Sequence, residues 1–134
     1  EHDFDTEFLD YILAVAVVDD LDAAIVGVGT APGADHFFIS EVNAQPAERS
    51  LLAQAVGDVL THFFRADGTL VPNISGYERV AFDTADLRRV RKVICLAGGR
   101  DKVPALIAAA RAGYYNMLVT DSVTAEAIYT MIRS

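Results

Sequence analysis

The stretch that decides the fold runs from Cys95 to Ile128 and reads CLAGGRDKVPALIAAARAGYYNMLVTDSVTAEAI. An apolar run stops at Gly98-Gly99, Lys102 follows three residues later, and a helical pattern begins at once. A second apolar run stops at Thr120-Asp121, where another helical pattern starts. Short apolar strands that alternate with helices indicate a parallel sheet with helices on both faces.

The same alternation extends toward the N-terminus. We predict strands over Ala23–Gly29, buried on both faces, over 56–64, over 92–97 and over 115–120. A tight turn at 65–68 leads to Thr69–Val71, and 72–82 is predicted as loop with one edge strand. The fold class is therefore α/β with a mostly parallel sheet, in which the strands around Ile25, Ile94 and Leu118 are parallel neighbours.

Five helices are predicted between these strands. The first covers Asp5–Asp20, where Phe8, Leu9, Ile12, Leu13 and Val17 recur at helical spacing. The second starts at Pro46, and a short third one over 84–90 is capped by Asp83. The fourth covers 101–113, and the last begins after Asp121 and runs to about Ile132.

Composition limits what the chain does. Its 134 residues, 52% of them hydrophobic, suffice for one domain with a real core, and 1–134 is interpreted as a single domain. The formal net charge of −8 argues against nucleic-acid binding by this chain, and the basic run 88–92 is interpreted as a solvated helix end. No apolar run is long enough to span a bilayer, no secretion signal is evident, and the lone Cys95 excludes an internal disulfide. These features favour a reducing, cytoplasmic setting without membrane contact.

Polar residues and glycines follow the predicted parallel strands. Gly29-Thr30, Gly98-Gly99 and Thr120-Asp121 should lie along one rim, because ligands bind beyond the carboxyl ends of such strands. Gly98 and Gly99 allow a close backbone approach, the next helix favours an anion, and Lys102 adds a positive charge. The alternative is that the glycines only make the turn and Lys102 is solvated.

The other candidates each have a structural alternative. Asp121 either caps the last helix or also binds a hydroxyl group. Asp58 stands inside a strand and should face a polar cavity or a partner, because an unpaired buried carboxylate is costly. His62 has no metal-ligand spacing, and Cys95 is interpreted as a small buried hydrophobe. Dinucleotide, Walker and nucleophile-elbow motifs are absent, so no cofactor is expected and covalent hydrolysis is disfavoured.

Three pieces together resemble the sugar-binding effector domain of SorC-type bacterial transcriptional regulators, which are related to the DeoR group. They are AAIVGVGT, AVGDVLTHFFRADGTLV and RVRKVICLAGGRDKVPALIAAARAGYYNMLVTDSVTAEAI, in this order. The last piece is the most specific, and the resemblance covers nearly the whole chain from about Ala23. It implies a Rossmann-like three-layer fold similar to that of sugar-phosphate isomerases.

The resemblance also implies a function. Gly98, Gly99 and Lys102 would contact the anionic group of a sugar or sugar phosphate, Asp58 would accept bonds from sugar hydroxyls, and Gly29 and Thr30 would line the same rim. Such regulators bind DNA through a helix-turn-helix domain that this chain does not resemble, so the chain looks like the C-terminal part of a homo-oligomeric regulator. His62, Arg65 and Val103-Pro104 depart from the family pattern.

Two other functions remain open on sequence grounds. An aldose–ketose isomerase or lactonase would need a general base, for which Asp58 or Asp121 is available without an obvious partner. A purely structural oligomerisation module becomes credible if the upstream part of the domain holds most of the pocket. A ligand-sensing effector domain without catalytic residues is the prediction.

Overall fold

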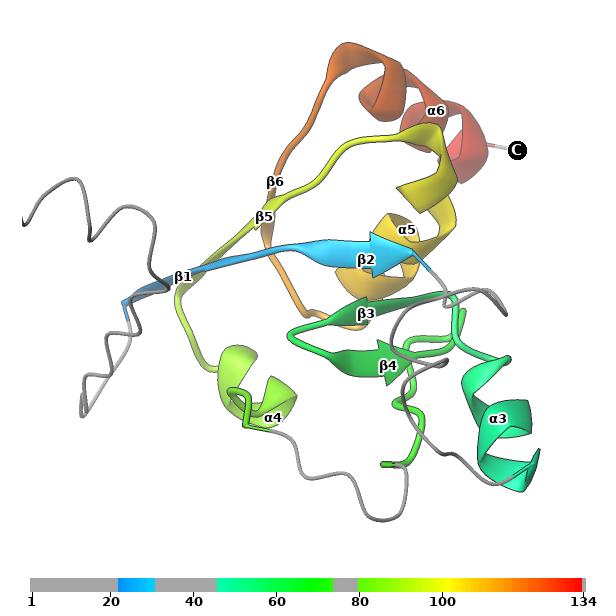
Figure 1. Ribbon diagram of the computed structural model, residues 1–134. Helices are drawn as coiled ribbons and strands as arrows, with labels where there is room; N and C mark the ends of the chain where they lie inside the picture. Colours follow the sequence, from blue (N-terminus) through cyan, green and yellow to red (C-terminus); the bar gives the residue numbers. More distant parts are fainter. Residues whose placement is uncertain (1–21, 31–45, 74–79, 134) are drawn as a thin grey trace, which may run out of the picture.

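A computed structural model describes residues 22–30, 46–73 and 80–133 of the chain. Its strands form two small sheets with helices packed beside them (Figure 1). One sheet is parallel with strand order β1-β5-β6, and the other is antiparallel with order β2-β3-β4. The predicted helix Asp5–Asp20, the loop after Thr30 and residues 74–79 lie outside the described ranges.

The parallel sheet confirms the predicted neighbours. It consists of β1 (Ala23–Val26), β5 (Lys92–Leu96) and β6 (Met117–Val119). Ile25 stands opposite Ile94, and Cys95 stands opposite Leu118. β5, which contains Cys95, and β6, which contains Leu118, therefore end at the same edge of one sheet, as the parallel arrangement requires.

The predicted single strand over Ala23–Gly29 is wrong. The chain leaves the parallel sheet at Gly27, and β2 (Val28–Thr30) joins the antiparallel sheet instead. Gly27 carries no side chain to hold the segment in either sheet, so the run can change partners there. Burial on both faces is also wrong for β1, because Ile25 is 68% exposed.

The predicted strand over 56–64 is a hairpin instead. Its strands are β3 (Gly57–Val59) and β4 (His62–Phe64), which pair antiparallel with Asp58 opposite Phe63. Leu60 and Thr61 both have positive φ angles, 49° and 63°, as the central residues of a type I′ hairpin turn do. The predicted turn at 65–68 is confirmed, because the Gly68 N–H donates to the Arg65 carbonyl at 2.8 Å.

The described helices agree with the predicted ones. They are α3 (Pro46–Leu52), α4 (Thr84–Leu87), the single 3-10 turn η1 (Arg100–Lys102), α5 (Val103–Arg111) and α6 (Ser122–Arg133). Of these, α3, α4 and α5 are shorter than predicted, and α6 is not. Asp83 caps α4 as expected, its carboxylate accepting the Ala85 N–H at 2.8 Å. Pro104 lies in the first turn of α5, where its missing N–H costs nothing. After α5 the chain reverses at Gly113, whose φ is +75°.

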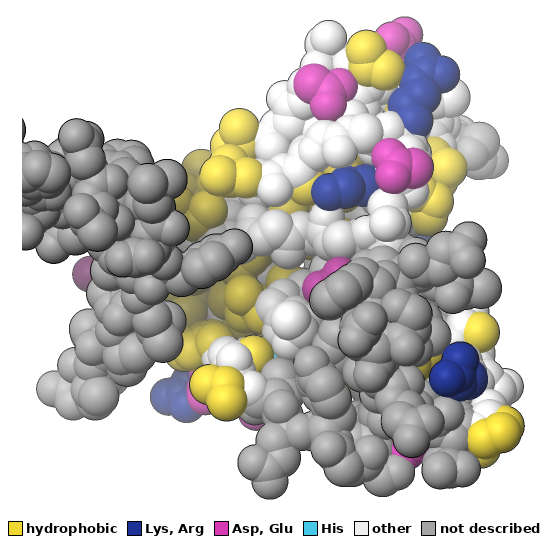
Figure 2. Space-filling view, viewed as in Figure 1, with side chains coloured by type: hydrophobic (Ala, Val, Ile, Leu, Met, Phe, Trp, Pro, Cys, Tyr) yellow, Lys and Arg dark blue, Asp and Glu magenta, His cyan; other side chains and the backbone are white. Residues whose placement is uncertain are grey.

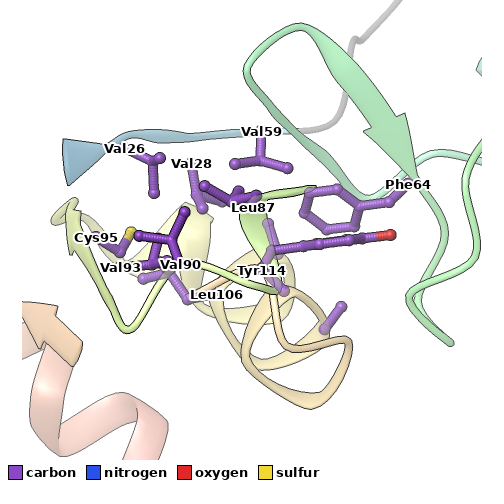
Figure 3. Close-up of a cluster of buried hydrophobic side chains, with 13 residues drawn as sticks. Val26, Val28, Val59, Phe64, Leu87, Val90, Val93, Cys95, Leu106 and Tyr114 are labelled. Carbon is purple, nitrogen blue, oxygen red and sulfur yellow. The ribbon is translucent and has the colours of Figure 1, made fainter. Parts of the chain in front are cut away.

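The main hydrophobic core lies between the parallel sheet, the antiparallel sheet, α4 and α5 (Figure 3). Val93 and Cys95 of β5 point into it, together with Leu106 of α5 and Leu87 of α4. The Phe64 and Tyr114 rings pack with centroids 5.5 Å apart, and the Tyr114 hydroxyl donates to the Gly68 carbonyl at 2.6 Å. This core fixes the position of α5, and with it the start of that helix at the rim.

The opposite face of the parallel sheet is not covered by any described helix. Side chains on that face alternate with the buried ones, and Lys92 and Leu96 of β5 are exposed. A second helical layer on this face remains a prediction. None of the described helices is long and apolar enough to cross a membrane.

Candidate functional site

The candidate site lies where β5 and β6 end. Gly98 follows β5 and lies directly against Asp121, which follows β6; a Cβ atom on Gly98 would stand 2.4 Å from Asp121 Oδ2. The neighbouring Gly99 has a φ of +117°, a backbone conformation that residues other than glycine rarely adopt. Gly98 and Asp121, both predicted from the sequence, are therefore in contact. The turn needs glycine at both Gly98 and Gly99.

Thr124 joins the two loops. Its hydroxyl oxygen accepts the Gly99 N–H at 2.7 Å, and the same hydroxyl donates to Asp121 Oδ2, also at 2.7 Å. Thr124 is 0% exposed although it lies in the first turn of α6. The Gly-Gly turn and the start of α6 are therefore held as one unit.

Asp121 is the N-cap of α6. Its Oδ1 accepts the Thr124 backbone N–H at 2.8 Å, so the carboxylate accepts from both donors of one residue. The backbone and hydroxyl hydrogen bonds from Thr124 lower the pKa of Asp121 from its usual 3.8. The carboxylate is itself exposed, so a ligand can reach lone pairs that Thr124 leaves unused.

Lys102 is placed at the same edge. It closes η1 directly before α5, its backbone N–H donates to the Gly99 carbonyl at 3.1 Å, and its side chain is half-buried. Neither salt bridge found in the described ranges involves Lys102. Its charge acts on the buried Cys95 thiol, whose pKa is raised by burial and lowered in smaller part by Lys102. The site thus holds a half-buried cation that no described carboxylate neutralises.

Asp58 and Gly29 form the second part of the rim. They face each other as a cross-strand pair of β2 and β3, and a Cβ atom on Gly29 would stand 2.0 Å from Asp58 Oδ1. Asp58 is half-buried and already engages a partner. Because Gly29 has no side chain, the Asp58 carboxylate can lie over β2.

The two parts of the rim adjoin each other through η1, which contacts both β2 and α6. The strand that holds Gly29 and Thr30 and the helix that follows Asp121 thus both lie against η1. Thr30, at the end of β2, is half-buried. The structure brings the predicted residues to one edge of the molecule, although β2 belongs to the antiparallel sheet.

Sequence reasoning missed one threonine at this edge, Thr124, and gave another, Thr120, only a place along the rim. Thr124 was not predicted, since its hydrogen bond reaches Gly99, 25 positions away. Thr120 Oγ1 is buried and has no hydrogen-bond partner among the described residues, and it would lie 3.9 Å from a Cβ atom on Gly98. A threonine three positions after an Asp helix cap was the one available signal for Thr124.

The chemistry of this edge is that of a polar binding surface. It offers an ammonium group at Lys102, two carboxylates at Asp58 and Asp121, and a hydroxyl group at Thr30. Within the described ranges no cluster of His, Cys, Asp and Glu side chains could hold a metal ion. Carboxylates bind hydroxyl groups and an ammonium binds an anion, so the set fits a polyhydroxylated or anionic small molecule.

His62 and Arg65 contribute to the hairpin instead. A ring nitrogen of His62, Nε2, lies 3.1 Å from the Phe82 carbonyl oxygen. The Arg65 guanidinium donates to the Gln54 side chain at 3.0 Å and to the Leu70 carbonyl at 2.8 Å. The contacts of Arg65 brace the end of the hairpin.

A family model described as "Putative sugar-binding domain" matches residues 13–130. Among curated proteins, the transcriptional regulator LsrR from Escherichia coli is 35% identical over 111 residues, which is 80% of this chain. Among solved structures, the full-length sorbitol operon regulator SorC from Klebsiella pneumoniae has a TM-score of 0.66 at 28% identity and covers 81% of this chain. A DeoR family transcriptional regulator from Listeria monocytogenes has a TM-score of 0.65 at 30% identity and covers 80% of it.

These relatives are much longer than the matched region. The match spans 35% of LsrR and 35% of the SorC chain. It spans 44% of the Listeria chain. The chain therefore corresponds to less than half of each relative.

Proposed function

The chain belongs to the sugar-binding domain family of SorC- and DeoR-type transcriptional regulators, and from this premise we propose that it senses a sugar or sugar phosphate at the edge formed by Lys102, Asp58 and Asp121. The observation that carries this proposal is the half-buried Lys102 beside the Gly98-Gly99 turn, which forms no salt bridge with a described carboxylate. A half-buried cation without a described carboxylate partner favours an anionic ligand.

The role proposed for each residue follows from its chemistry. Lys102 pairs with the phosphate or another anionic group, and Gly98 and Gly99 let that group approach the backbone. Asp58 and the unused lone pairs of Asp121 accept hydrogen bonds from sugar hydroxyls. Gly29 and Thr30 line the edge on the side of β2.

A regulatory role is favoured over catalysis. The matched relatives are transcriptional regulators, and the lowered pKa of Asp121 makes it a poor general base near neutral pH. We propose that ligand binding shifts contacts within a homo-oligomer and that DNA is bound by a separate domain of the regulator. On this account the protein acts in the cytoplasm and turns over no substrate.

The experiment that tests this function is a ligand titration of the purified chain. Sugar phosphates such as ribose 5-phosphate, fructose 6-phosphate and sorbitol 6-phosphate are titrated beside their unphosphorylated forms, and product formation is followed by NMR. Saturable binding of at least one compound, with no product, supports the sensor. Conversion of a bound sugar phosphate to its isomer would establish the enzyme instead, and absence of binding by every compound would contradict the proposal.

A further inference from the structure

A cavity lies away from the candidate site. Its volume is about 510 Å³, within the range of roughly 300–1,000 Å³ that small-molecule sites occupy. The turn 67–70, the start of α4 and the chain around the end of α5 line it. Since α4 leads into β5 and Tyr114 precedes β6, the cavity lies toward the amino ends of these strands, whereas the candidate site follows their carboxyl ends. In Figure 2 the charged side chains at the lower left, where α4 lies, are well separated from those around α6 at the top.

The inner wall of this cavity is held by Tyr114. Its side chain is buried, its ring packs against Phe64, and its hydroxyl donates to the Gly68 carbonyl at 2.6 Å (Figure 3). Gly68 has a φ of +82°, and a Cβ atom there would stand 2.6 Å from the Ala112 Cβ atom. The turn therefore lies directly against the end of α5, and the wall is in place without a ligand.

Two carboxylates line the cavity, and each already accepts hydrogen bonds from its own segment. Asp67 accepts the Thr69 backbone N–H at 2.9 Å and the Thr69 hydroxyl at 2.7 Å, and these bonds lower the pKa of Asp67 from its usual 3.8. Asp83 accepts the Ala85 N–H at 2.8 Å as the cap of α4. The two carboxylates thus hold the turn and the helix start in place on two sides of the cavity.

Arg88 is the cation that lines this cavity. Its guanidinium carbon lies 5.3 Å from the centre of the Tyr114 ring. Neither salt bridge found among the residues that the structure describes involves Arg88, and one of them joins the neighbouring Arg89 to Asp86 at 3.6 Å. We propose that Arg88 binds a small organic monocarboxylate in this cavity. The first residue of the basic run 88–92 then has a role that a solvated helix end does not give it.

The lining decides the class of ligand. A guanidinium group binds a carboxylate through two parallel N–H···O bonds, which gives it both affinity and orientation. Leu70, Ala85 and Ala112 supply apolar surface for the rest of the molecule. Asp67 and Asp83 place negative charge in the same cavity, so an anion with a single charge is favoured over a phosphate ester with two. This ligand differs in charge and in polarity from the sugar phosphate proposed for the edge at Lys102.

The test uses benzoate as the probe, with benzyl alcohol and benzamidinium as neutral and cationic molecules of similar shape. Each is titrated into the whole isotope-labelled chain, and the backbone amide signals are followed by NMR. Benzoate should shift the amides of Gly68, Thr69 and Ala85 with a Kd on the order of 1 mM. Benzyl alcohol should bind about tenfold more weakly, because it offers no partner to the guanidinium. The proposal is overturned if benzoate produces no saturable shift at these amides, or if benzamidinium binds there as tightly as benzoate.

A pair of variants identifies the cation. Arg88→Gln should weaken benzoate binding about tenfold, whereas Arg89→Gln, at the next position, should leave it within about twofold. Ala85→Leu keeps the charge but fills part of the cavity from an exposed position, and it should also weaken binding. Equal affinities of Arg88→Gln and the unaltered chain would contradict the proposal. If Arg88→Gln prevents folding, Ala85→Leu and the comparison of benzoate with benzamidinium still decide.

The same variants keep this site separate from the edge at Lys102. Arg88→Gln should bind sugar phosphates as the unaltered chain does, and Lys102→Ala should bind benzoate unchanged. Benzoate that shifts the amides of Gly98 and Gly99 and leaves Gly68 unmoved would place the probe at the candidate site and contradict the proposal.

Discussion

The Gly99 N–H donates to the Thr124 hydroxyl across 2.7 Å, and this bond joins the turn after β5 to the helix after β6. The Thr124 hydroxyl in turn donates a hydrogen bond to Asp121 Oδ2, so one buried hydroxyl satisfies a donor in one loop and an acceptor in the other. The two loops cannot move apart without breaking this chain of bonds. The shape of the candidate site therefore depends on a residue that is too buried to touch a ligand.

Replacing Thr124 by valine should destabilise the protein by about 1–3 kcal/mol, because a part-buried N–H loses its acceptor and valine cannot bond to Asp121. Chemical denaturation with linear extrapolation measures the change. The matched control is Thr130→Val, which removes an exposed hydroxyl that donates to the Glu126 carbonyl on the same helix. That control should change stability by less than about 0.5 kcal/mol. Equal losses in the two variants would show that the link to Gly99 contributes little.

Asp121→Asn should make stability less dependent on pH in acid. Hydrogen bonds from Thr124 lower the pKa of Asp121 in the folded state below the 3.8 of an unperturbed aspartate. A depressed folded pKa gives stability that is present above the unfolded value and is lost as pH falls through the folded value. Asparagine still caps the helix but does not titrate, so the stability difference between the two proteins should shrink below about pH 4. Unfolding curves from pH 7 to pH 2 measure it, and a constant difference would contradict the assigned cause.

Gly29→Ala should weaken ligand binding about tenfold or more, because its Cβ atom would stand 2.0 Å from Asp58 Oδ1 and push the carboxylate away. The matched control is Gly27→Ala, because a Cβ atom at Gly27 meets nothing within 4 Å. Titration with the tightest sugar or sugar phosphate compares the two variants. If Gly29→Ala binds as well as Gly27→Ala does, Asp58 has no part in recognition.

The arrangement of the parallel strands could be predicted because it depends on local pattern. Each apolar run before Gly98 and Thr120 leads straight into a helix, and only a parallel pair satisfies that order. The cap at Asp83 was likewise predictable from three neighbouring residues.

What could not be predicted depends on contacts between distant residues. The sequence around Leu60 and Thr61 does not predict a hairpin, because neither position holds the asparagine or glycine that usually adopts a positive φ angle. β1 ends before Gly27 because β2 pairs with β3 and not with a strand of the parallel sheet. The sequence also does not reveal that one face of β1 is exposed, because Ile25 is an apolar residue whether or not another element covers it. At the site, the sequence around Thr124 indicates only a helix residue, because its contact with Gly99 forms only in the folded chain.

Calorimetric titration of Lys102→Ala tests the central claim most directly, with the tightest sugar phosphate and its unphosphorylated form as ligands. The control protein is Lys92→Ala, which removes an exposed lysine at the opposite end of β5. If Lys102 binds the phosphate, its removal should weaken the phosphorylated ligand by about 1.5–3 kcal/mol, the range for a hydrogen bond to a charged group. The unphosphorylated form should lose much less, and Lys92→Ala should bind both ligands as the unaltered chain does. Equal losses for the two ligands, or no loss for either, would contradict the account.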